Sequence, residues 1–297
     1  MARQQGMADA GRDVVAPMVL GAWDAFIEQA IKVDLEAPTR LPGWRAHEVC
    51  VHLGCWPEHD ALTGLIASAR AGGQGSPPDP DAVNARLTAG RRDASRDEVL
   101  AALHRHREAA ARYLADEPVE LDTALTVSTV GRLPMLSVVL GQAYELAVHG
   151  LDLADAGAPP VPPPVLQSGI AALADVTGAL AAGCDITGGA TLTSPDGGWR
   201  FAAEGGGWTV TRVPGGAATG TVVEAPADLL LDAASGRVNP VAAVARRRLK
   251  VHHLGGLLRL APIVESAPGI PGGPILHLAA RTLGSAGGVV GRFLRRG

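Results

Sequence analysis

Apolar residues recur at helical spacing along the first half of the chain. This pattern predicts amphipathic helices over residues 14–34 and 97–117, and a further helix after the Pro-Gly turn at Pro42. The longest and most apolar helical pattern covers residues 135–156. Long helices joined by loops, with no sustained alternation of period two, are typical of helix bundles. We therefore expect a four-helix bundle over residues 14–156.

The pattern changes after a proline-rich stretch at residues 157–164, which predicts a stiff linker. Beyond it, one helical pattern is followed by short β-rich runs between glycine-rich turns, and then by further helical patterns. We expect an α+β domain with an antiparallel sheet over residues 165–262. The fold class is thus an α domain followed by an α+β domain, flanked by a disordered N-terminus (1–13) and a C-terminal extension (263–297).

Composition and charge narrow the possible partners. The formal net charge is -4 and the arginines are scattered, so no basic stripe predicts nucleic-acid binding. No apolar run reaches the ~20 residues that a spanning helix needs, and no signal peptide is evident, so a membrane partner is not expected. The 3 cysteines form neither a disulfide framework nor a CxxC pair. We expect a cytoplasmic protein that is a monomer or a weak homodimer.

Polar residues in two apolar helical faces suggest a metal site. Glu145 and His149 are four residues apart, which places both on one helical face. His52 lies in the apolar face of the second predicted helix, and the three together make the two-histidine, one-glutamate set of a catalytic zinc site. Asp152 could accept a hydrogen bond from the other ring nitrogen of His149. The alternatives are a surface Glu-His pair and buried histidines satisfied by hydrogen bonds.

Two segments carry a family resemblance. LPGWRAHEVCVHL (residues 41–53) and GRLPMLSVVLGQAYELAVHGLDLADAG (131–157) resemble the two signatures of the mycothiol-dependent maleylpyruvate isomerase family, whose N-terminal domain is a DinB-like four-helix bundle. ASGRVNPVAAVARRRLKVHHLGGLLRL (234–260) is similar to the sterol-carrier-protein-like C-terminal domain of many members. Arg45 departs from the pattern, since a small hydroxyl residue that can cap the helix usually follows the tryptophan.

The resemblance implies a set of functional residues. A zinc ion or another divalent metal would be held by His52, Glu145 and His149. An arginine of the second domain is implicated at the family's active site, which corresponds to Arg237; it would bind a substrate carboxylate as a bidentate pair. Asn84 and Arg86, predicted in a loop, are further candidates for contacts with a low-molecular-weight thiol or the substrate, although a solvated loop is the favoured interpretation of both.

The implied activity is thiol chemistry with mycothiol as the cofactor or co-substrate. Cys50, Cys55 and Cys184 lack an evident partner base, so the nucleophile would arrive with the thiol. Addition of the thiolate to a small electrophile would make the protein an S-transferase, or a cis-trans isomerase of the maleylpyruvate type if the addition is reversible. A broad-specificity detoxifying thiol transferase is a variant of this reading. The alternative from a different class is a non-catalytic binding module that holds an apolar small molecule.

Overall fold

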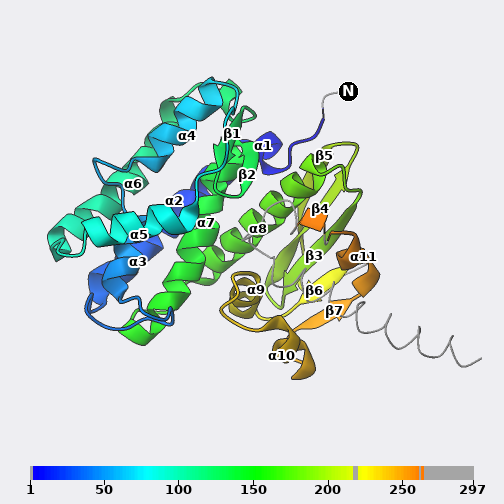
Figure 1. The fold of residues 1–297 in the computed structure, drawn as a ribbon. Helices are drawn as coiled ribbons and strands as arrows, with labels where there is room; N and C mark the ends of the chain where they lie inside the picture. The colour runs from blue at the N-terminus through cyan, green and yellow to red at the C-terminus, as the bar shows by residue number, and fades with distance from the viewer. Residues whose placement is uncertain (1–2, 217–219, 261, 264–297) are drawn as a thin grey trace, which may run out of the picture.

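The computed structural model describes residues 3–216, 220–260 and 262–263. The helical elements up to α7 lie on one side, and a five-stranded sheet lies on the other (Figure 1). The first half consists of α1 (Met7–Ala10), α2 (Arg12–Lys32), α3 (Ala46–Leu53), α4 (Ala61–Arg70), α5 (Pro80–Gly90), α6 (Arg96–Asp116), η1 (Val119–Leu121), β1 (Leu125–Ser128), β2 (Gly131–Pro134), α7 (Met135–Asp152) and η2 (Leu153–Ala156). The second half consists of α8 (Pro163–Gly183), β3 (Gly188–Ser194), β4 (Gly197–Glu204), β5 (Gly207–Val213), β6 (Val222–Glu224), α9 (Ala227–Ala234), α10 (Pro240–Ala245), β7 (Lys250–His252) and α11 (Leu254–Arg259).

The predicted mixed class, a helical region followed by a sheet-containing region, is confirmed. In the helical region α2 packs against both α6 and α7, and α3 packs against α6. Ser95 caps α6 with a capping box: its hydroxyl oxygen accepts from the Glu98 backbone N–H, and its own backbone N–H donates to the Glu98 carboxylate. The second predicted helix is interrupted, because α3 ends at Leu53 and α4 begins only at Ala61, after Pro57.

The loop in which Asn84 and Arg86 are predicted ends earlier than expected. Helix α5 begins at Pro80, where the missing N–H costs nothing and the fixed φ suits the first helical position. The carboxylate of Asp79 accepts hydrogen bonds from the backbone N–H groups of Asp81 and Ala82. Asn84 and Arg86 therefore lie on a helix and not in a loop.

The sheet has the strand order β5-β4-β3-β6-β7. Three of its strand pairs are antiparallel, but β6 runs parallel to β3, so the predicted antiparallel sheet is wrong at that pair. The reason is that β6 joins the free edge of β3 and not that of β5. Alternation of side chains with a period of two specifies a strand without naming its partner or direction.

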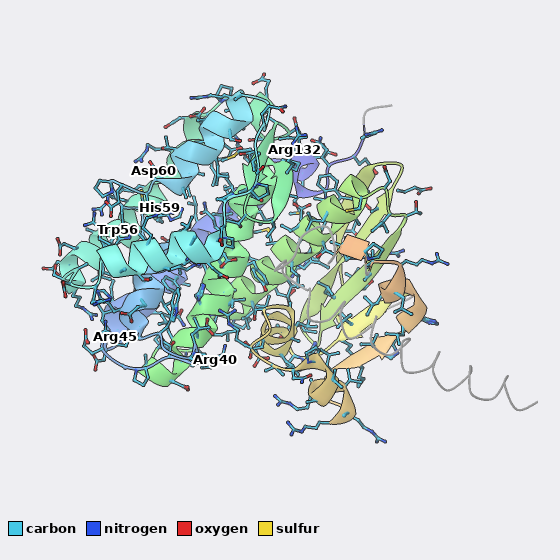
Figure 2. All side chains as sticks on the ribbon, in the orientation of Figure 1. Arg40, Arg45, Trp56, His59, Asp60 and Arg132 are labelled. Carbon is cyan, nitrogen blue, oxygen red and sulfur yellow. The ribbon has the colours of Figure 1, made fainter. Side chains whose placement is uncertain are left out.

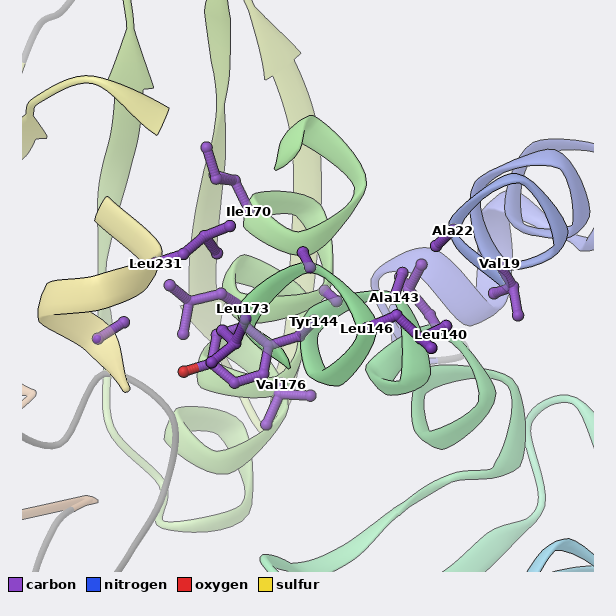
Figure 3. Close-up of a cluster of buried hydrophobic side chains, with 14 of the residues drawn as sticks. Val19, Ala22, Leu140, Ala143, Tyr144, Leu146, Ile170, Leu173, Val176 and Leu231 are labelled. Atoms are coloured by element: carbon purple, nitrogen blue, oxygen red, sulfur yellow. The ribbon is translucent and has the colours of Figure 1, made fainter. Parts of the chain in front are cut away.

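Helix α8 forms the layer between α7 and the sheet. Leu140 and Ala143 of α7 face Val19 and Ala22 of α2 on one side, whereas Tyr144 faces α8 and α9 on the other (Figure 3). The labelled apolar residues on that side are Ile170, Leu173 and Val176 of α8 and Leu231 of α9, all of them buried. Because α7 and α8 pack along each other, the predicted linker over residues 157–164 does not hold the two halves apart.

The N-terminal segment, predicted as disordered, has defined partners in the structure. The backbone N–H of Trp208 donates to Gln4 O at 3.0 Å, and the N–H of Gly6 donates to Trp208 O at 2.9 Å. Met7 is only 2% exposed. The segment satisfies backbone groups at the edge of β5 that would otherwise be unpaired, which the sequence pattern does not reveal. The predicted C-terminal extension lies outside the described residues, except for the buried Ile263.

Two described helices, α2 and α8, are long and apolar enough to span a membrane by length and composition alone. In α8, 83% of the apolar window is buried inside the protein. Its position between α7 and the sheet therefore accounts for its apolar character.

Candidate metal site

The structure brings together His52 from α3 and Glu145 and His149 from α7. One potential ligand atom of each residue lies within 4.8 Å of the other two. Nε2 of His149 is 3.6 Å from Oε2 of Glu145. The rings of His52 and His149 meet edge to face, with their centroids 5.1 Å apart. Helical spacing places the two α7 residues side by side, and the packing of the bundle adds His52.

This donor set fits a divalent metal. Ligand atoms about 2.0–2.1 Å from a tetrahedral zinc ion are roughly 3.4 Å from one another, close to the observed His149–Glu145 distance. Nδ1 of His52 is buried and has no hydrogen-bond partner among the described residues, so hydrogen bonds within the protein leave one nitrogen of this imidazole unsatisfied. The Glu145 side chain is 48% exposed, so the cluster is reachable from solvent on that side.

The electrostatic environment keeps His52 neutral. Burial is the main cause that lowers the pKa of His52, to about 3, and the nearby His149 lowers it further. The side chain of Asn84 acts in the opposite direction, but its effect is outweighed. The neutral imidazole is the form that coordinates metals, so this histidine is ready to bind one at neutral pH.

Asp152, at the end of α7, supports His149 from behind. Its Oδ2 is 3.0 Å from Nδ1 of His149, and its side chain is fully buried. Burial by itself would raise the pKa of Asp152, but hydrogen bonds from His149 and Arg237 outweigh burial and lower the pKa. An ionised carboxylate only accepts hydrogen bonds, so Nδ1 of His149 carries the proton and the Nε2 lone pair faces the cluster.

Arg237 makes a different contact from the one predicted. Its Nη2 donates to Oδ2 of Asp152 at 2.8 Å and its Nε donates to Oδ1 at 3.3 Å, while Nη1 donates to the carbonyl of Ser235. The bidentate edge of the guanidinium is therefore occupied by a carboxylate of the protein. This geometry does not support the predicted bidentate contact with a substrate carboxylate.

The two predicted thiol-contact residues differ in position. Asn84 lies beside His52 and lines a pocket of about 510 Å³. Arg86 is exposed on α5 and does not line this pocket. Arg92 does line it, as does Trp44, whose ring centroid is 5.8 Å from that of His52.

A second hollow and the thiols of Cys50 and Cys55 lie outside the candidate ligand set. A hollow of about 850 Å³ lies along β3, β4 and β5 and contains none of the predicted site residues. Burial raises the pKa of the Cys50 thiol to about 12, and burial followed by Asp60 raises the pKa of Cys55. A raised pKa leaves less thiolate at neutral pH, which makes both thiols weaker nucleophiles.

Comparison with known proteins supports the family resemblance noted in the sequence. Residues 19–154 match the family model described as the mycothiol maleylpyruvate isomerase N-terminal domain. A crystal structure of the mycothiol-dependent maleylpyruvate isomerase has 18% sequence identity and a TM-score of 0.50, over 78% of this chain and 92% of that chain. A mutant of that isomerase gives 16% identity and a TM-score of 0.50, over 84% and 96% of the two chains. No curated protein matches the sequence significantly.

The fold and the cluster define a helical domain with a candidate two-histidine, one-glutamate metal site, joined to an α+β domain. The helical part of the chain, residues 19–154, matches the mycothiol maleylpyruvate isomerase N-terminal domain family. Over 78% of the chain, the fold is similar to that of the mycothiol-dependent maleylpyruvate isomerase.

Proposed function

We propose that this protein is a metal-dependent enzyme that uses a low-molecular-weight thiol of the mycothiol type to isomerise a small electrophile with a cis double bond. The isomerisation would proceed by reversible addition of the thiol. The observation that carries the proposal is the convergence of His52, Glu145 and His149 within 4.8 Å. The name of the structurally similar isomerase favours isomerisation over S-conjugation. A reducing cytoplasm is the proposed location, and the 3 free cysteines are compatible with it.

His52, Glu145 and His149 would hold the metal, and zinc suits the nitrogen and oxygen donors. A bound zinc ion would lower the pKa of a thiol, so that the thiolate is available near neutral pH. Asp152 holds the proton on Nδ1 of His149 and so keeps the Nε2 lone pair available. The exposed Glu145 side leaves an approach for small molecules.

The pocket beside His52 is the proposed place for the body of the thiol. Trp44 and Asn84 each contact His52 and also line the pocket, so a ligand there would lie next to the cluster. Glu48, Thr88 and Arg92 add polar groups to the wall. Such a wall suits a polar ligand better than an apolar one, because every buried polar group needs a partner.

The first test is the metal content of the purified protein, measured by mass spectrometry. We expect near-stoichiometric zinc in the wild type, and its loss in His52→Ala and Glu145→Ala variants that remain folded. His47→Ala is the matched control, since His47 lies on the same helix but contacts the carbonyl of Ala94. It should keep the metal.

Two outcomes would contradict the proposal at different levels. No metal in the wild type, even after zinc is supplied, would favour the non-catalytic binding module. Metal without thiol-dependent turnover of a cis enedioate, but with thiol conjugation of other electrophiles, would favour the S-transferase. Omitting the thiol is the control for both reactions.

A further inference from the structure

The loop of residues 38–45, between α2 and α3, reaches both histidines of the candidate site. Pro38 pairs with Arg45 across the base of this loop, and the Thr39 N–H donates to Trp44 O at 3.1 Å. Trp44 stands edge-on to His52. At the other end of the loop Arg40 contacts Asp152, the residue that supports His149. One short loop therefore contacts His52 directly, through Trp44, and the hydrogen-bond partner of His149, through Arg40.

Arg40 is anchored in the second half of the chain. Its Nη1 and Nη2 donate to the two carboxylate oxygens of Asp232 on α9, at 3.0 and 2.9 Å. This is the bidentate geometry that a planar guanidinium forms with a carboxylate. Arg40 is placed between the C-terminal end of α7 and α9 (Figure 2).

From this anchored position Arg40 contacts Asp152 twice. Its Nη2 lies 3.5 Å from Oδ1 of Asp152, and its backbone N–H donates to the Asp152 carbonyl at 3.3 Å. Arg237 holds the same carboxylate from its other side. The two arginines balance Asp152 and Asp232, so the fully buried Asp152 is surrounded by compensating charge.

We propose that Arg40 is a positioning residue for His149: by bridging Asp232 and Asp152, it fixes the carboxylate that orients the imidazole. The proposal rests on the metal site proposed above. Partners of ligating histidines set the tautomer and the direction of the lone pair, and their loss typically weakens metal binding about 10- to 100-fold. Through Arg40, the packing of α9 against α7 would affect the orientation of His149 and hence the affinity for the metal.

The test compares Arg40→Met with Arg45→Met. Arg45 is in the same loop and is also ion-paired, but with Glu36 and Glu48 and not with Asp152. Two quantities are measured: the affinity for zinc, by competition with a chromophoric chelator, and the His149 tautomer in metal-free protein, by long-range ¹H–¹⁵N NMR of the ring. We expect Arg40→Met to bind zinc about tenfold more weakly and to show mixed tautomers. Arg45→Met should match the wild type in both.

A wild-type affinity together with a wild-type tautomer in Arg40→Met would overturn the proposal. Asp232→Asn, which removes the anchor with little change of shape, should shift both readouts in the same direction and serves if Arg40→Met does not fold. If the wild type binds no zinc but the tautomer still depends on Arg40, the metal site is wrong and the positioning role stands. Arg40→Lys should restore part of the affinity, because it keeps the charge but not the bidentate geometry.

Discussion

Nδ1 of His149 and Oδ2 of Asp152 lie 3.0 Å apart, three residues along the same helix. The i, i+3 spacing puts both side chains on one face of α7, so the contact is set locally. The Asp152 carboxylate also lies at the interface between the two halves of the chain, where it contacts Arg237 and Arg40. The orientation of one potential metal ligand is therefore coupled to the way the two halves pack.

The first prediction concerns the charge of Asp152. Asp152→Asn keeps the volume of the side chain but removes its charge and replaces one acceptor oxygen by an NH2 donor, so the proton is held less firmly on Nδ1 of His149. We expect zinc affinity to fall about 10- to 100-fold, measured by chelator competition. Asp155→Asn, an exposed residue in the next turn, is the control and should bind as the wild type does. An unchanged affinity in Asp152→Asn would show that this hydrogen bond does not tune the site.

The second prediction separates two roles for Arg237. Lysine keeps the positive charge but cannot donate two parallel N–H bonds to Asp152. If the observed contact is the functional one, Arg237→Lys weakens zinc binding and lowers the free energy of unfolding by about 1–2 kcal/mol. Urea unfolding and metal titration measure both effects. A raised KM for carboxylate substrates with unchanged zinc affinity would instead restore the predicted substrate-binding role.

The third prediction is a pH dependence of stability that arises at Asp175. Burial is the main cause that raises the pKa of Asp175 above its usual 3.8, and the hydrogen bonds it accepts only partly offset this. The folded protein therefore binds this proton more tightly than the unfolded chain. The resulting stability is fully present below the unfolded pKa and is lost as the pH rises through the folded pKa.

Asp175→Asn should remove the loss of stability at higher pH, because the amide does not ionise. The amide oxygen can still accept from the Met7 N–H and the Trp208 ring N–H, which donate to Oδ1 at 2.9 and 2.8 Å. We expect the variant to gain about 1–3 kcal/mol relative to the wild type between pH 4 and pH 8, the cost of a buried charge without full compensation. Urea unfolding at both pH values measures the gain. A difference that does not change with pH would refute this role for Asp175.

The fourth prediction tests the ordered N-terminal segment. Met7→Ala should lower the free energy of unfolding by about 2–4 kcal/mol, because it empties a buried site. Val14→Ala, in the exposed part of α2, should change stability by less than about 0.5 kcal/mol. Both are measured by urea unfolding. Equal stability of Met7→Ala and the wild type would favour the disordered N-terminus predicted from the sequence.

Local patterns in the sequence predicted a substantial part of this protein. Helical periodicity indicated the main helices and β-rich runs indicated the sheet, because these patterns depend on neighbouring residues only. The pair Glu145 and His149, and the support from Asp152, followed from helical spacing in the same way. The boundary of α5 was missed, although Asp79 before Pro80 is a recognisable start signal. Reading that signal would have placed Asn84 and Arg86 on a helix.

The sequence by itself therefore determined which elements form and which side chains share a helical face, since both depend on spacing along the chain. Only the tertiary structure decided that His52 meets the α7 pair, that Arg237 turns to Asp152, and that Arg40 links Asp152 to Asp232. It also decided that β6 runs parallel to β3 and that the N-terminal segment pairs with β5. Each of these contacts joins residues far apart in the chain. Which residues meet depends on tertiary packing and on the burial of charge, and local periodicity carries no information about either.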